Sequence, residues 1–354
     1  GATKENQTDK IGRFGLGFNA VYNLTDVPSF VSRHSIVIFD PHTTHLGKNI
    51  KNKAKPGIKI DVRKHRRKLR RLGNQFKPYN DVFGCDLRPE GRQDLYDGTL
   101  FRFPLRTRNE ALRSEICQKH YDDTEVRLLL QMLIKGAETL LLFTQNITKI
   151  SVYHLSARAS SATEMGELFS VEKRPAMILR ELTPTVPLPP AAKNIASPVQ
   201  QLIENCSILR ASTACLKQLN HGASVQSVQW PDSCVIFELA VRVSTEGEVV
   251  LEQARTQHTQ PWMVTTYMGQ GEVLRMALQE ENLLPTASVA VPLKKIYEGI
   301  YEPVQVVNAQ GDHDGTVFSS LPLPVHSGLP VHINAPFAVT ASRRHLCEKT
   351  EDDK

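Results

Sequence analysis

The feature that most constrains the fold is a glycine-rich run near the start of the chain, IGRFGLGF at residues 11–18, which leads into a helix-like stretch, Phe18–Leu24. Gly12, Gly15 and Gly17 allow successive backbone amides to turn toward one point, because no Cβ stands in the way. A helix start adds unpaired N–H groups and a partial positive charge. The spacing therefore indicates a phosphate-binding loop, although glycine-rich runs of this kind also serve as plain turns.

Two better-known nucleotide motifs can be compared with this run. The chain contains no GxxxxGK[ST], which excludes a P-loop. Gly15, Gly17 and Ala20 fit the dinucleotide pattern GxGxxA, and Asp40 follows at the distance of a ribose-binding acid. That fingerprint requires an apolar strand directly before its first glycine, whereas this chain has QTDKIGRF there. The preceding sequence therefore argues against a Rossmann site.

Two further polar clusters suggest chemistry. The DHDGT run at residues 312–316 resembles the nucleophile loop of haloacid-dehalogenase phosphatases, but no apolar strand precedes it, so we expect an exposed Asp-Gly turn. His42 and His45 are spaced like metal ligands. No third ligand is evident and the pair follows a Pro turn, which favours a loop role.

The pattern of apolar residues predicts a mixed fold. At 354 residues the chain is long for one compact domain. No apolar run approaches the ~18 residues of a membrane span. A proline-rich stretch at residues 184–190 predicts a linker. Helices are expected within 69–76, 109–143 and 273–284, and strands at 29–32, 35–39 (fully buried), 100–105, 149–155, 234–243, 249–253 and 289–291. This mixture predicts an α+β fold in two layers.

Charge is concentrated in one segment. Residues 48–71 contain twelve Lys or Arg and one acid, a net charge of +11, whereas the whole chain carries +6, so the remainder sums to −5. The segment lacks the interleaved aromatic residues of a single-strand nucleic-acid platform. A solvated helix face is the favoured interpretation, with an acidic protein partner second, and nucleic acid is disfavoured as a partner. The six cysteines form no CxxC pair, which indicates reduced thiols in an intracellular protein.

Longer motifs carry a family resemblance. The stretch IGRFGLGFNAVYNLTDVPSF resembles the second glycine motif of the GHKL ATPases, which include gyrase, Hsp90, histidine kinases and MutL. The runs SIVIFDPHTTHLG, NQFKPYNDVFGCDL, GTLFRFPLR and GLPVHINAPFAVTASRRHL are similar to Hsp90-like repeats of the sacsin type, so the resemblance spans nearly the whole chain. It implies the C-terminal half of an Hsp90-like ATP-binding domain at residues 1–107, a helical connector and strand at 108–183, and a middle-type α/β segment at 184–354.

The resemblance also implies roles for particular residues. The glycine-rich loop would wrap the phosphates of ATP at the hinge of a lid, whose trailing end would be residues 1–10. The threonine of the Gly98-Thr99 pair would help to hold the adenine. Arg343, with Arg344 as the alternative, would reach the γ-phosphate. The implied cofactor-binding residues are Gly12, Arg13, Phe14, Gly15, Leu16, Gly17, Phe18 and Thr99.

Two motifs of that family are absent from the chain. No glutamate is followed four residues later by an asparagine, so the E-x-x-x-N helix that activates water and holds Mg²⁺ is missing, as is DxGxG. Both precede the second glycine loop in the family, so we expect them before Gly1, including the asparagine ligand of Mg²⁺. The chain alone is therefore expected to bind ATP weakly or not at all, and not to hydrolyse it.

The implied parent is a large cytoplasmic chaperone or co-chaperone that uses ATP and Mg²⁺, acts on client proteins, and works with Hsp70 and the proteasome system. Two other functions stay open at this point. One is a protein–protein scaffold that keeps the GHKL fold without turnover, and the other is a nuclear GHKL ATPase that acts on chromatin.

Overall fold

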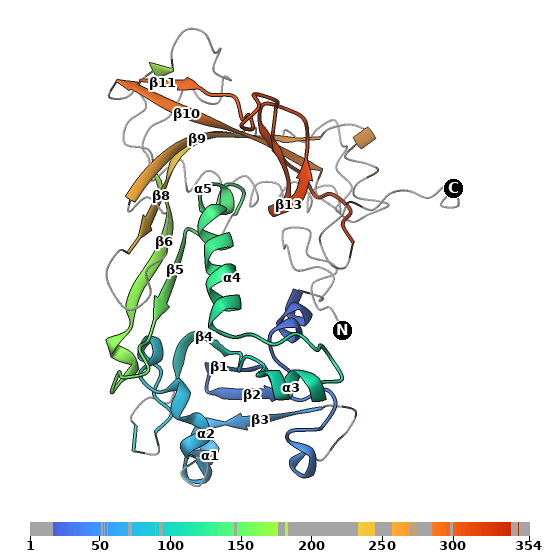
Figure 1. Ribbon diagram of the computed structural model, residues 1–354, viewed down its shortest axis with the longest axis vertical. Coiled ribbons are helices and arrows are strands. Elements are labelled where there is room, and N and C mark those ends of the chain that lie inside the picture. Colours follow the sequence, from blue (N-terminus) through green and yellow to red (C-terminus); the bar gives the residue numbers. More distant parts are fainter. Residues whose placement is uncertain are drawn as a thin grey trace, which may run out of the picture.

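The computed structural model describes residues 17–50, 52, 54, 56–69, 73–88, 90–91, 95–144, 147–175, 181–182, 233–244, 257–269, 272–273, 276, 285–297, 300–340 and 346. They form a small sheet at one end, a large curved sheet at the other, and a helix, α4, that runs between the two (Figure 1). The predicted α+β class is confirmed.

The strands are β1 (Ser29–Arg33), β2 (Ser35–Phe39), β3 (Gly57–Asp61), β4 (Tyr96–Arg102), β5 (Lys149–His154), β6 (Gly166–Pro175), β7 (Glu181–Leu182), β8 (Ser233–Val243), β9 (Gln257–Met268), β10 (Thr286–Tyr297), β11 (Ile300–Pro303), β12 (Thr316–Ser319), β13 (Leu321–His326) and β14 (His332–Asn334). The α-helices are α1 (Val62–Leu69), α2 (Gly73–Phe76), α3 (Arg108–Arg113), α4 (Asp123–Lys135) and α5 (Ala137–Leu140), and the 3-10 helices are η1 (Gly17–Asn23), η2 (Gly47–Asn49), η4 (Lys77–Tyr79), η5 (Val82–Gly84) and η6 (Ala162–Glu164). Within the described ranges, no helix has both the length and the apolar character needed to cross a membrane.

The small sheet is antiparallel, in the order β3-β2-β1-β4. Val31 and Ile36 are fully buried on one face, where they pack with Val62 of α1 and Phe76 of α2. The expectation that residues 35–39 are buried on both faces is wrong. Only Ile36 of β2 is fully buried, because α1 and α2 pack against one face of the sheet, whereas the other face stays partly exposed.

The predicted helical region 109–143 contains three helices, and polar caps separate the first two. Thr107 starts α3 in a capping box with Glu110. After α3, the Ser114 hydroxyl accepts hydrogen bonds from two later backbone amides, and these stabilise a non-helical turn. Asp122 then caps α4 by accepting from the Glu125 amide at 3.0 Å. Strand β3 was not predicted, because its short alternating pattern lies within the basic segment, where charged residues dominate the sequence.

The large sheet has ten strands in the described part of the chain, in the order β13-β12-β14-β10-β9-β8-β6-β5, with β11 and β7 attached at β10. The predicted strand 234–243 is present as β8. Its described partners are β6 and β9, while the predicted partner 249–253 and the predicted linker 184–190 lie outside the described residues. Because β6 pairs with β8, this sheet continues across the predicted boundary at residue 183, which itself stays a prediction.

The core of the large sheet lies on its concave face. Helix α5 and the residues after it pack there, with Leu141 and Leu142 almost fully buried against Phe169 and Phe237 (Figure 1). The buried Lys173 ammonium also points to this side, where it donates to the carbonyls of Leu142 and Thr144 at 3.3 and 3.2 Å. It therefore fastens the end of α5 to the sheet.

Candidate functional site

One face of the small sheet is lined by aromatic rings and is turned away from α1 and α2. We call it the aromatic face, and it carries Phe30, Phe39 and Phe101. The register pairs Phe30 with Phe101 and Ser32 with Thr99, so strand alternation places these four residues on the same side. The Phe30 and Phe101 rings lie 5.4 Å apart, and Phe101 is 46% exposed. An exposed aromatic surface of this kind can stack against a planar ligand.

The end of the glycine-rich loop lies on this aromatic face. Helix η1 begins at Gly17, and the centroid of the Phe18 ring lies 5.1 Å from that of Phe39 and 6.1 Å from that of Phe101. The helix predicted after the loop is therefore present, as a tighter 3-10 helix, and its first aromatic residue holds it against the sheet. The Phe18 ring is consequently held next to Phe101 of β4.

Thr99 lies on the same face, two residues from Phe101. Its hydroxyl is 3.0 Å from the Ser32 hydroxyl, which in turn donates to the Gly98 carbonyl at 3.1 Å. Since a hydroxyl has one proton, Ser32 accepts from Thr99, and the lone pairs of Thr99 remain available to accept from a ligand amino group. Gly98 has φ +141°, a conformation that favours glycine, which explains why glycine precedes the threonine.

A buried arginine ties η1 to the segment that leads into α3. Arg106 is 2% exposed, and its Nε donates to Asp26 Oδ1 at 2.6 Å. Its guanidinium also donates to the carbonyls of Tyr22 and Asn23, at the end of η1. Ser114 donates to the same Asp26 oxygen at 2.9 Å. A displacement of η1 would therefore be transmitted to α3 through these contacts.

The structure places part of the predicted site. Phe18 and Thr99 both lie on the aromatic face, and Gly17 directly precedes Phe18. The other predicted residues, Gly12, Arg13, Phe14, Gly15, Leu16, Arg343 and Arg344, lie outside the described residues. Sequence reasoning missed Ser32, Asp26 and Arg106. Their partners lie up to 84 residues away in the chain, so no local pattern could have identified them.

Asp40 of the dinucleotide pattern and His42 of the histidine pair both make contacts that stabilise the fold near β2. Asp40 is 1% exposed, and its Oδ2 accepts from the amides of His45 and Leu46 at 2.9 and 2.6 Å, which closes the turn after β2. His42 lies 3.2 Å from the Glu115 carboxylate. In the described part of the chain, both neighbours of β2 are antiparallel to it, unlike the parallel strand that carries the ribose-binding acid in a Rossmann unit. Among the described residues, no three His, Cys, Asp or Glu side chains form a metal-binding group.

The prediction of an exposed Asp-Gly turn within the DHDGT run is wrong: the turn lies just before the run, at residues 308–311, and Gly315 is buried where the chain enters β12. Asn308 Oδ1 accepts from the amides of Gln310 and Asp312 at 2.9 and 3.0 Å, and Asp312 is exposed. In the basic segment, α1 carries exposed Arg63 and Lys64, and Arg63 pairs with Asp61 at 3.3 Å. These features agree with a solvated helix face.

Comparisons with known proteins agree with the resemblance in the sequence. A family model described as "Sacsin domain" matches residues 1–166. Sacsin from Homo sapiens is 30% identical over 361 residues, which cover 97% of this chain and 8% of the human protein. The chain thus spans less than a tenth of the length of that relative. The chain therefore belongs to the sacsin family and carries its sacsin domain at residues 1–166.

Proposed function

We propose that the chain is the phosphate-loop half of an Hsp90-like ATP-binding module in a sacsin-type chaperone. The observation that carries this proposal is the shared position of Phe18 and Thr99 on the aromatic face. Phe18 follows the last glycine of the loop, and the Thr99 hydroxyl would serve as the acceptor for the adenine amino group, so their shared face supports a nucleotide site there. The phosphates would contact backbone amides of the loop, and the adenine would lie toward Thr99.

In this proposal the bound nucleotide acts on the rest of the chain through Arg106. Phosphate contacts that order the loop would fix η1, whose end is hydrogen-bonded to Arg106. The segment after Arg106 leads through α3 and α4 to α5, which is part of the core of the large sheet. Nucleotide could thus bias the docking of the small sheet against the large one, an order–disorder switch.

The wider role that we propose is protein folding and quality control in the cytoplasm, with client proteins and with Hsp70 and the proteasome system as partners. ATP with Mg²⁺ is the proposed cofactor, and the Mg²⁺ ligand is expected outside this chain. The alternative that the same geometry permits is a scaffold that binds nucleotide without turnover.

The test is calorimetric titration of ATP·Mg²⁺ into the chain itself and into a longer piece of the parent protein that includes the expected E-x-x-x-N and DxGxG motifs. We expect weak binding by the chain and tighter binding by the longer piece. Thr99→Val removes one hydrogen-bonding group, and Gly15→Val places a side chain in the phosphate loop. Each should weaken ATP binding by about tenfold. Thr148→Val, an exposed threonine before β5, is the matched control.

Equal ATP affinity in Thr99→Val, Gly15→Val and the control would refute the proposed site. Saturable ATP turnover by the chain alone, lost in Gly15→Val, would refute the proposal that this chain holds only half of the ATP site. ATP binding without turnover in the longer piece would favour the scaffold.

A further inference from the structure

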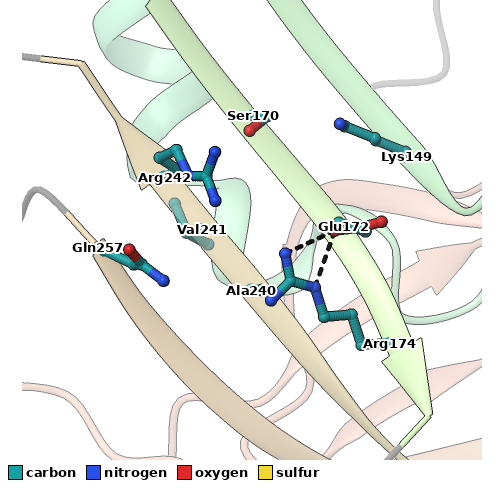
Figure 2. A pocket seen from close by; sticks show the side chains of 8 residues that line it. All are labelled: Lys149, Ser170, Glu172, Arg174, Ala240, Val241, Arg242 and Gln257. Carbon is teal, nitrogen blue, oxygen red and sulfur yellow. Dashed lines mark hydrogen bonds and ion pairs between the residues drawn. The ribbon is translucent and has the colours of Figure 1, made fainter.

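A small polar hollow lies on the convex side of the large sheet, on the face opposite the core (Figure 2). Its volume is about 300 Å³, open solvent included, and its principal lining residues are Lys149, Glu172, Arg174, Ala240, Arg242 and Gln257. They come from β5, β6, β8 and β9. This hollow belongs to a different sheet from the aromatic face and plays no part in the function proposed above.

Strand alternation creates the hollow. On β6, Phe169 and Val171 face the core, so Ser170 and Glu172 face outward. The register sets Arg242 opposite Ser170 on one side and opposite Gln257 on the other. Ala240 has a shorter side chain than the lining residues around it, so the space above its methyl group stays open (Figure 2).

The residues that line the hollow carry a net positive charge. Three cations, Lys149, Arg174 and Arg242, line it together with one carboxylate, Glu172. That carboxylate is held by Arg174, with Nη2–Oε2 at 2.7 Å and Nε–Oε2 at 2.8 Å. The register sets Lys149 opposite Glu172 and Arg174 opposite Glu238, so these two cations face carboxylates across the strands. Arg242 instead faces the uncharged Ser170 and Gln257 on its two sides.

Arg242 is the cation left without a counterion. Among the residues that the structure describes, none forms an ion pair or hydrogen bond with its side chain. The nearby carboxylate of Glu167 accepts from Ser170 at 2.8 Å, and Glu238 lies opposite Arg174, four residues from Arg242. The guanidinium of Arg242 and the ammonium of Lys149 both point toward the space above Ser170 (Figure 2).

We propose that this hollow binds a single phosphate group, as inorganic phosphate or as a small phosphate monoester. Arg242 supplies the planar donor pair that matches two phosphate oxygens, and Lys149 and the Gln257 amide supply further donors. The hollow is shallow and small, so it suits one phosphate group better than an extended polyanion.

The test is calorimetric titration of the whole chain at pH 7.5 and low ionic strength, with inorganic phosphate and, separately, with glycerol 3-phosphate. Arg242→Gln removes the donor pair and keeps an amide, and it should weaken binding of the preferred probe by at least about tenfold. Lys295→Gln, at an exposed position on β10, is the matched control for loss of one positive charge. Circular dichroism verifies that each variant folds.

The Gly15→Val variant distinguishes phosphate binding in this hollow from phosphate binding at the glycine-rich loop. Binding that survives Gly15→Val and is lost in Arg242→Gln supports the proposal, and the probe with the higher affinity identifies the form of phosphate. Binding that is lost in Gly15→Val but kept in Arg242→Gln places the phosphate at the loop and overturns the proposal. Equal weakening by Arg242→Gln and Lys295→Gln, or no saturable binding of either probe below about 10 mM, also overturns it.

Discussion

His332 on β14 makes the stability of the large sheet dependent on pH. The imidazole is 5% exposed, and its ring centroid lies 5.4 Å from that of Trp262 and 5.6 Å from that of Phe318. Its Nδ1 accepts a hydrogen bond from the Thr316 amide at 3.0 Å, so in the neutral ring the proton is on Nε2. Burial lowers the pKa of His332 to about 4, an effect that the nearby Asp314 carboxylate partly opposes.

The sign of the pH effect follows from the depressed pKa. Above pH 6.5 the imidazole is neutral in both the folded and the unfolded chain, and its full contribution to stability is present. As the pH falls from 6.5 toward 4, the unfolded chain takes up the proton first, so the free energy of unfolding decreases. The pKa is 6.5 in the unfolded chain and about 4 in the folded chain, and this difference corresponds to about 3 kcal/mol of unfolding free energy. About 2 kcal/mol of it is lost by pH 5.

Trp262 reports on this region because it contacts His332 directly. In a Trp230→Phe background it is the single tryptophan of the chain. Urea unfolding followed by Trp262 fluorescence between pH 7.5 and pH 5 gives the free energy at each pH. His332→Asn keeps an acceptor for the Thr316 amide but cannot titrate, so its stability should fall by about 2 kcal/mol less than that of the parent over this range.

His313→Asn, at an exposed position in the turn before β12, is the matched control and should follow the parent. The reasoning fails if His332→Asn and the parent show the same pH dependence. It also fails if NMR detects titration of the His332 ring near its ordinary pKa of about 6.5 in the folded chain.

Two further predictions concern packing. Arg106→Met leaves Asp26 and two backbone carbonyls without their buried donor. The small sheet should lose about 3 kcal/mol of stability, and amide exchange in η1 should become faster. Arg108→Met, at an exposed position, should have neither effect. Gly315→Ala places a Cβ 2.0 Å from the Val331 carbonyl oxygen and should lower the free energy of unfolding by about 1–3 kcal/mol in urea melts. Gly166→Ala, where a Cβ meets nothing within 4 Å, is its control, and equal effects of the two changes would contradict this account.

Strands were predictable where local pattern decides them. Strand β2 coincides with the predicted run 35–39, and β8 contains 234–243. The turn expected within the DHDGT run lies just before it, at 308–311. The predicted strand 100–105 instead begins earlier and ends at Arg102, before Pro104, whose ring cannot donate to a ladder. Region 109–143 was predicted as one helical stretch because its apolar periodicity outweighed the polar caps that interrupt it.

The sequence by itself determined the elements of the candidate site that depend on local chemistry. These are the glycine spacing that ends at Gly17 and the Gly98-Thr99 pair, where a positive φ requires the glycine. Only the tertiary structure decided that Phe18 and Thr99 share one face, because that depends on the register between strands whose paired residues, Ser32 and Thr99, lie 67 positions apart. The same holds for the buried contact of Arg106 with η1. Local propensity acts over a few residues, whereas register and the burial of a charge are set by packing across the whole fold.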